Sequence, residues 1–227
     1  MLDMSSLCRV LKLCNPDEIY NLAAQSHVRI SFDQPIYTTH SIATGTLNLL
    51  ESIRLMSPNA KMYQASSSEM FGNNIDEDGY HESPRRGINF VTNKVAKEAV
   101  KIKLGLTNEL RLGNLNASRD WGHAKDYVKA MWLILQHDKA DDFVCSTGIS
   151  HTVKDLVVYI FSSLGLDWED YVRVDGKYLR PEELEHLKGD CSKIKDDLGW
   201  SHNYTFESML DEMVEYWMEH YLNNSSN

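Results

Sequence analysis

Two polar clusters follow short apolar runs and carry side chains that could bind a ligand or move a proton. The first is NLAAQSHV over 21–28, where small residues would let a flat ligand approach the backbone and Gln25 or Ser26 could hydrogen-bond a ribose or phosphate. The second is YQASSSEMFG over 63–72, where three hydroxyls could orient a sugar hydroxyl and a buried Glu69 could act as a general base. Each cluster is also compatible with an ordinary polar loop, in which Ser26 is a helix N-cap and Glu69 is solvated.

Three later segments add positive charge. HESPRRGINFVTNK over 81–94 contains adjacent arginines that could clamp a phosphate, although such pairs also occur on solvated surfaces. In the next segment, LGNLNASRDWGHAKDYV, Arg119 offers a charge, Trp121 offers a stacking face, and Asp126 is a helix cap or a ligand. The last, YLRPEELE, is also typical of a helix that starts at a proline.

The elements that position these clusters alternate between short strands and amphipathic helices. Apolar runs predict strands over 18–23, 61–66 and 142–146, and 3.6-residue periodicity predicts helices over 38–56, 89–104, 126–137, 152–164, 192–198 and 206–222. We expect inward faces formed by Ile42, Thr46, Leu49, Leu50, Ile53 and Met56 in one helix and by Val128, Met131, Trp132 and Leu135 in another. Thr152 and Asp155 resemble a capping box, and Gly105 and Gly199 are expected helix stops. This order predicts an α/β fold with a mainly parallel sheet, whose ligands bind beyond the carboxyl ends of the strands.

Composition limits the class of protein. The chain has 227 residues, 42% hydrophobic and 25% charged, which is typical of a globular protein with a sizeable core. A net charge of −10 disfavours a nucleic-acid partner, so any phosphate ligand requires a local basic cluster. No apolar run is long enough for a membrane span, and no secretory signal is recognisable at the start. Four scattered cysteines without a CxxC pair predict free thiols in the cytoplasm and no metal site.

Together and in this order, the segments resemble those of one enzyme family. EIYNLAAQSHV, YQASSSEMFG, HESPRRGINFVTNK, RDWGHAKDYVKAMW, LRPEE and KGDCSK are similar to the GDP-mannose 4,6-dehydratases, which are extended short-chain dehydrogenases/reductases. The resemblance covers nearly all of 3–221 and implies a truncated Rossmann-like parallel sheet with a smaller C-terminal α/β substrate-binding part. It also implies NADP as cofactor, GDP-mannose as substrate, and a homo-oligomer that is a dimer or a tetramer.

The resemblance assigns a role to each matching position. Ser67 would hydrogen-bond the 4-hydroxyl of the sugar, and Glu69 would take the C5 proton and assist loss of the 6-hydroxyl. The cofactor-binding residues would be Leu22, Ala23, Ala24, Gln25, Ser26, Tyr37, His81 and Arg86, and the residues that hold GDP-mannose would be Lys94, Arg119, Arg180 and Glu183. We expect the three cations of the last set to converge on one diphosphate-sized hollow beside Ser67 and Glu69. We divide the chain into a partial NADP-binding domain (1–80), a mixed region (81–149), a mainly substrate-binding part (150–222) and a tail (223–227).

Two parts of the family pattern are absent from the sequence. The family begins with a strand, a glycine-rich turn and a helix, but here none of the 12 glycines has that spacing, and Met1 and Leu2 already fall near a cofactor contact. A Tyr-x-x-x-Lys segment should precede His81, but none of the 11 tyrosines has a lysine four residues later. Tyr80 stands where the family has an asparagine that contacts the substrate.

These gaps lead to three expectations for the chain. The first, which we favour, is a truncated or mis-spliced product with little or no dehydratase activity; the gaps would also arise if the sequence omitted stretches of a longer protein. The second is a non-catalytic remnant that binds the nucleotide sugar or pairs with intact subunits. The third is a chain that does not fold stably, because deleting strands exposes apolar faces and unpaired edges.

Overall fold

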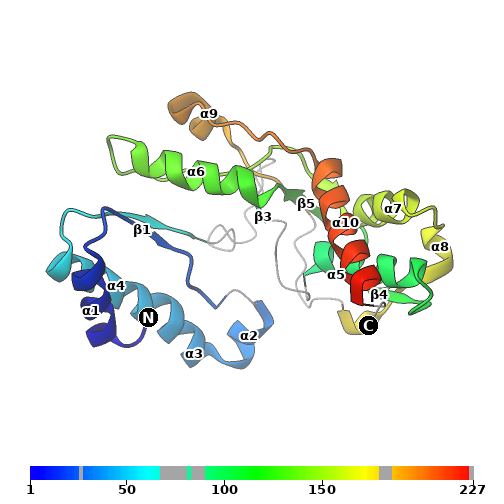
Figure 1. Cartoon of the computed structure of the whole chain (residues 1–227), viewed down its shortest axis with the longest axis horizontal. Helices are drawn as coiled ribbons and strands as arrows, with labels where there is room; N and C mark the ends of the chain where they lie inside the picture. Colours follow the sequence, from blue (N-terminus) through cyan, green and yellow to red (C-terminus); the bar gives the residue numbers. More distant parts are fainter. Residues whose placement is uncertain (26–27, 67–80, 83–89, 179–185, 225–227) are drawn as a thin grey trace. The chain divides into compact units, whose positions relative to one another are not determined.

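The structure is a computed structural model that describes residues 1–25, 28–66, 81–82, 90–178 and 186–224. The chain divides into two compact units (Figure 1). Unit 1 comprises Met1–Ser67 together with Ile134–Gln136, and unit 2 comprises Ser68–Leu133 together with His137–Asn227. These units are defined by contacts and not by function, so the predicted division into functional regions, with boundaries after residues 80, 149 and 222, stays a prediction. No helix in the described part of the chain is both long and apolar enough to cross a membrane.

Unit 1 is built on two parallel strands. Strands β1 (Glu18–Asn21) and β2 (Lys61–Gln64) pair in register from Glu18 with Lys61 to Asn21 with Gln64. Both strands were predicted, each two residues longer than observed. Helix α1 (Met4–Cys14), which the sequence analysis did not predict, begins at the N-cap Asp3 and packs against the long helical segment that precedes β2. The small core of this unit consists of Leu11, Leu49 and Ile53.

That long helical segment contains three consecutive elements. Helices α3 (Pro35–Thr39) and α4 (Gly45–Met56) are joined by the π-helical turn η1 (His40–Thr44), and the short helix α2 (Val28–Asp33) precedes them. The helix predicted over 38–56 is therefore confirmed, but its predicted inward face is only partly right. Leu49 and Ile53 are buried, whereas Ile42, Leu50 and Met56 are exposed. Ile42 lies within the π turn, which rotates the helix out of its 3.6-residue register and so moves Ile42 off the face of Leu49 and Ile53. Leu50 directly follows Leu49 and so points about 100° away from it around the helix.

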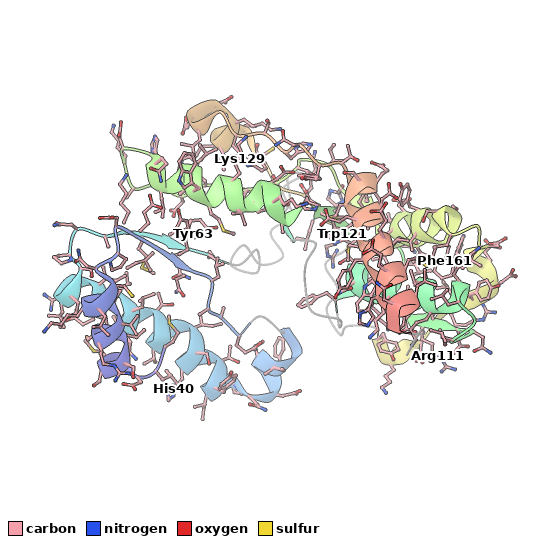
Figure 2. The ribbon with its side chains drawn as sticks, viewed as in Figure 1. His40, Tyr63, Arg111, Trp121, Lys129 and Phe161 are labelled. Atoms are coloured by element: carbon pink, nitrogen blue, oxygen red, sulfur yellow. The ribbon has the colours of Figure 1, made fainter. Side chains whose placement is uncertain are left out.

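The described residues of unit 2 form two small sheets, and one strand pairs with every other strand of the larger sheet. Strand β5 (Ser118–Trp121) pairs in parallel with β3 (His81–Glu82) and β8 (His186–Leu187), and antiparallel with β6 (His151–Thr152). Figure 2 labels Trp121 at the end of this strand. A separate parallel pair is formed by β4 (Leu110–Leu112) and β7 (Val172–Val174). The predicted α/β class with mainly parallel pairing is thus confirmed.

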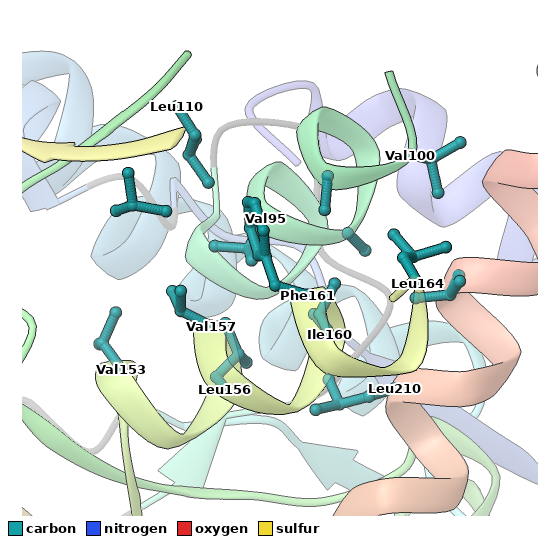
Figure 3. Packing of buried hydrophobic residues seen from close by; sticks show 14 of the residues in the cluster. Val95, Val100, Leu110, Val153, Leu156, Val157, Ile160, Phe161, Leu164 and Leu210 are labelled. Atoms are coloured by element: carbon teal, nitrogen blue, oxygen red, sulfur yellow. The ribbon is translucent and has the colours of Figure 1, made fainter. Parts of the chain in front are cut away.

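Helices enclose the main core of unit 2. Helices α5 (Val91–Lys103), α7 (Val153–Ser163) and α10 (Phe206–Asn224) pack against one another, and Figure 3 shows their apolar side chains interdigitating. Val95, Leu156, Ile160, Phe161 and Leu210 are almost completely buried in this cluster. Helix α7 begins with the predicted capping box. The other helical elements among the described residues of this unit are α6 (Ala124–Gln136), whose last turn belongs to unit 1, α8 (Trp168–Tyr171), η3 (Gly176–Tyr178) and α9 (Ser192–Leu198), which ends at Gly199 as predicted.

Two expectations for unit 2 are wrong. Residues 142–146 form no strand, and directly after them the backbone N–H groups of Thr147 and Gly148 donate to the side chain of Asp120 rather than to a ladder. In α6, the expected inward residue Leu135 is buried, but Val128 and Trp132 are more than half exposed, and Tyr127 and Ala130 are buried in their place. Apolar residues occur on nearly every side of this helix, so periodicity could not select its buried face.

Candidate functional site

The two polar clusters of unit 1 begin side by side at one sheet edge. Because β1 and β2 are parallel and Asn21 is opposite Gln64, both strands end at the same edge. The Asn21 side chain is buried there; its amide donates to the Gln64 side chain at 2.7 Å, and its oxygen accepts from the Ala23 backbone N–H at 3.2 Å. The Ala65 backbone N–H also donates to the Asn21 carbonyl at 3.0 Å. These contacts fix the point where the chain leaves each strand.

A cavity of about 380 Å³ lies beyond the end of β1. Four of the predicted cofactor-binding residues line it, namely Ala23, Ala24, Gln25 and Tyr37, together with Met1, Leu2 and Ser41. The Gln25 amide donates to the Thr38 hydroxyl at 3.3 Å, which connects the loop after β1 to α3. Leu22 is exposed and does not line the cavity. Sequence reasoning missed Ser41, although it lies one helical turn after Tyr37 and so faces the same side.

In unit 2, β5 pairs with β3, which carries His81, and with β8, the strand that follows the YLRPEELE segment. The strand carries Arg119, and Asp120 is in register with His81 on β3. Arg119 itself is in register with Leu187 on β8, the strand that directly follows the segment containing Arg180 and Glu183. The Arg119 guanidinium donates to the Ser118 carbonyl at 2.8 Å. Segments more than 60 residues apart in sequence therefore meet at Arg119.

Lys94 lies near the start of α5, where its ammonium group donates to the Arg111 carbonyl at 2.6 Å. It also lies 4.0 Å from the centre of the Tyr178 ring, an aromatic face that attracts a cation. Burial of this ammonium group lowers the pKa of Lys94 below its ordinary value. Tyr178 immediately precedes the segment with Arg180, so Lys94 contacts the chain next to another residue of the predicted GDP-mannose set.

Other candidates of the same motif have structural roles. Trp121 is buried and stacks on Phe206 with ring centres 5.8 Å apart, so it offers no face to a ligand. The buried Asp126 accepts backbone N–H groups from Asn203 at 3.0 Å and Tyr204 at 3.1 Å, so it ties α6 to the start of α10.

The remaining predicted residues lie outside what the structure describes. For His81 the structure describes the backbone and not the side chain. The predicted site residues that are not described at all are Ser26, Ser67, Glu69, Arg86, Arg180 and Glu183. Their roles, and the convergence of Lys94, Arg119 and Arg180 on one hollow, stay predictions. His151 was not predicted; it lies opposite Arg119 in the β5–β6 ladder, and its ring stacks on Phe206 with centres 3.9 Å apart.

Comparison with known proteins identifies the family. The sequence profile described as GDP-mannose 4,6 dehydratase matches residues 1–82 and 77–213. The two matches meet where the sequence analysis placed the internal gap, between Tyr80 and His81.

Relatives in plants and animals match across most of their length. GDP-mannose 4,6 dehydratase 1 of Arabidopsis thaliana is 44% identical over 256 residues, covering 94% of this chain and 71% of the relative. The GDP-mannose 4,6 dehydratase of Homo sapiens is 38% identical over 271 residues, covering 93% of this chain and 73% of the relative. Both alignments are longer than the 227-residue chain, so each relative has residues inside the alignment that this chain lacks.

Solved structures support the Rossmann-like fold. RMD from Pseudomonas aeruginosa complexed with NADPH superposes with a TM-score of 0.87 at 19% identity, covering 96% of this chain and 86% of that one. UDP-glucose 4-epimerase from Thermotoga maritima superposes with a TM-score of 0.81 at 21% identity, covering 97% and 83%. With the family profile matching most of the sequence and relatives of up to 44% identity, the chain belongs to the GDP-mannose 4,6 dehydratase family.

Proposed function

We propose that this chain binds GDP-mannose and a nicotinamide dinucleotide for the dehydratase reaction of its family, and that its own turnover is absent or strongly reduced. In that reaction C4 of the mannose is oxidised, water is eliminated across C5 and C6, and the hydride returns to C6. The observation that carries the proposal is the pairing of β5, in which Arg119 lies opposite Leu187 of β8 and Asp120 lies opposite His81 of β3.

The cavity of unit 1 fits part of a nicotinamide dinucleotide. Its alanines at 23 and 24 leave room for a flat ring close to the backbone, while Gln25, Tyr37 and Ser41 supply groups that can hydrogen-bond a ribose. When bound, the nicotinamide ring would accept and return the hydride. For NADP, we propose that His81 and Arg86 provide positive charge for the 2′-phosphate.

The GDP-mannose site would lie around β5. Arg119 and Lys94 are described cations of the predicted set, and Arg180 would complete a local basic cluster in a chain of net charge −10. A guanidinium group can hold a phosphate with two parallel hydrogen bonds, and charge-assisted bonds of this kind are about twice as strong as neutral ones. We assign Glu183 to the same ligand.

Ser67 and Glu69 would act on the sugar. They follow β2, whose end is fastened to Asn21 at the edge where the cofactor loop also begins. A serine hydroxyl there would orient the 4-hydroxyl, and a carboxylate in a dry pocket would move the C5 proton and assist departure of the 6-hydroxyl.

Reduced turnover follows from the missing base. The sequence contains no Tyr-x-x-x-Lys pair, and the family matches meet at 77–82, where that segment should begin. Loss of a general base typically costs ~10²–10⁴ in rate. Incubation of the chain with NADP and GDP-mannose should therefore yield little dehydrated product by mass spectrometry, although both ligands should raise the melting temperature. Turnover comparable to that of an intact relative would refute the impairment, and absence of a thermal shift with GDP-mannose would refute the binding.

A second candidate is a non-catalytic module that binds the nucleotide sugar or pairs with intact subunits. It is favoured by the same alignments, because the chain keeps the segments around Lys94 and Arg119 while lacking an internal stretch. Mixing the chain with an intact relative tests the subunit-pairing form of this candidate. A module that pairs with subunits should change the sedimentation of the relative, and an unchanged sedimentation profile would remove that form.

We also propose a homo-oligomer, a dimer or tetramer, located in the cytoplasm. The four cysteines are free thiols, as expected in a reducing compartment. Analytical ultracentrifugation and cell fractionation test these two proposals.

A further inference from the structure

The most completely enclosed acid of the described residues is Asp120, the residue after Arg119 on β5. Its side chain has no exposed surface. One carboxylate oxygen accepts from the Thr147 backbone N–H at 3.1 Å and from the Thr147 hydroxyl at 2.6 Å. The other oxygen accepts from the backbone N–H groups of Gly148 at 2.9 Å and Gly189 at 3.3 Å. Four donors thus surround a group that only accepts, which suits a carboxylate and not an amide.

These donors belong to the chain segments next to Arg119. Thr147 and Gly148 lie just before β6, where His151 is opposite Arg119, and Gly189 lies just after β8, where Leu187 is opposite Arg119. One carboxylate therefore fastens both strands that flank the arginine. Since successive residues of a strand point to opposite faces, Asp120 can do this from the face opposite Arg119.

The turn at Gly148 supports the same arrangement. Gly148 has φ of +79°, a backbone conformation that side chains disfavour, and a Cβ there would lie 3.4 Å from the Cys191 sulfur. Glycine at this position lets the chain present two successive N–H groups, those of Thr147 and Gly148, to the two carboxylate oxygens.

We propose that Asp120 is a positioning residue for GDP-mannose binding: it holds the three strands around Arg119 in the register that aims the guanidinium at the ligand. This inference rests on the proposed function, because it takes Arg119 as a ligand of the nucleotide sugar. A merely structural Asp120 would stabilise the fold without any specific effect on affinity.

Calorimetric titration with GDP-mannose on a double-mutant cycle separates these roles. We expect Asp120→Asn to weaken the Kd about tenfold, because an amide leaves at least one buried N–H unpaired and loosens the strands. In the Arg119→Ala background the same substitution should change the Kd by less than about twofold, since the group it positions is gone. The matched control is Asp126→Asn, which also removes a buried carboxylate that accepts two backbone N–H groups, and it should change the Kd by less than about twofold.

A second pair of variants, at Thr147, tests the same inference if Asp120→Asn does not fold. Thr147→Val removes the 2.6 Å hydroxyl bond and should weaken binding about threefold, whereas Thr147→Ser keeps the hydroxyl and should restore the native Kd. Equal losses for Asp120→Asn and Asp126→Asn, additive losses in the cycle, or no rescue by serine would overturn the inference and leave the proposed function standing. No binding by the unaltered chain would overturn both.

Discussion

Gly122 should tolerate no side chain, because the ring of Tyr127 lies directly over it. A Cβ at Gly122 would be 2.3 Å from the Tyr127 hydroxyl oxygen, 2.7 Å from its Cζ and 3.0 Å from a methyl carbon of Thr147. The tyrosine has little room to move, since it is buried and its ring stacks on Trp200 with centres 6.4 Å apart. Two contacts below 3.0 Å to a confined ring require a shift of α6 or of the segment at 122.

Overpacking of this kind typically lowers the free energy of unfolding by about 1–3 kcal/mol. Because the Tyr127 ring is confined, we expect Gly122→Ala to lie at the upper end of this range, at about 2–3 kcal/mol. For a domain of this size that corresponds to a melting temperature about 5–10 °C lower. The control is Gly176→Ala, where a Cβ meets nothing within 4 Å and φ is not positive, so its effect should stay within about 0.5 kcal/mol.

Urea denaturation followed by tryptophan fluorescence measures both variants, because Trp200 is part of the stack. Adding Tyr127→Phe to Gly122→Ala should recover part of the loss, since it removes the atom at 2.3 Å and leaves the one at 2.7 Å. Equal stability of the two glycine variants, or no recovery in the double variant, would refute the reasoning.

Three further predictions concern the caps, the core and the ligand. Hydrogen bonds from Thr152 hold the pKa of Asp155 below its ordinary value of 3.8, so Asp155→Ala should lower the free energy of unfolding by about 0.5–1 kcal/mol at neutral pH. The difference between the two proteins should shrink as acid protonates the native carboxylate. A difference that is unchanged in acid would argue against the capping box. Asn93→Leu leaves the Trp217 indole N–H without its 2.7 Å acceptor and should cost about 1–3 kcal/mol in urea denaturation, so a neutral result would show that this bond contributes nothing. Lys94→Ala should weaken GDP-mannose binding about tenfold in calorimetry, and an unchanged Kd would remove Lys94 from the site.

Features governed by local sequence could be predicted. The capping box of Thr152 and Asp155 and the stop at Gly199, which has φ of +62°, depend on residues within one turn. Strands β1 and β2 were found because each is a short apolar run followed by small polar residues. The small residues and Gln25 that line the cavity were candidates from their residue types, whereas Tyr37 came only from the family resemblance. Ser41 could have been added from its spacing to Tyr37.

Features set by long-range pairing could not be predicted. Strand β5 has the sequence SRDW, with two charged residues in four, and it forms because partners from three distant segments pair with it. Burial of Asp120 depends on N–H groups contributed by Thr147, Gly148 and Gly189, which no local pattern reveals.

The most direct test is a calorimetric titration of GDP-mannose into the chain, alongside Arg119→Ala. Arg119 is the residue of β5 that lies opposite both β6 and β8, and charge-assisted hydrogen bonds contribute about 1.5–3 kcal/mol. We predict saturable binding to the unaltered chain and a Kd about 10- to 100-fold weaker for the variant. No heat of binding for the unaltered chain, or the same Kd for both proteins, would contradict the account.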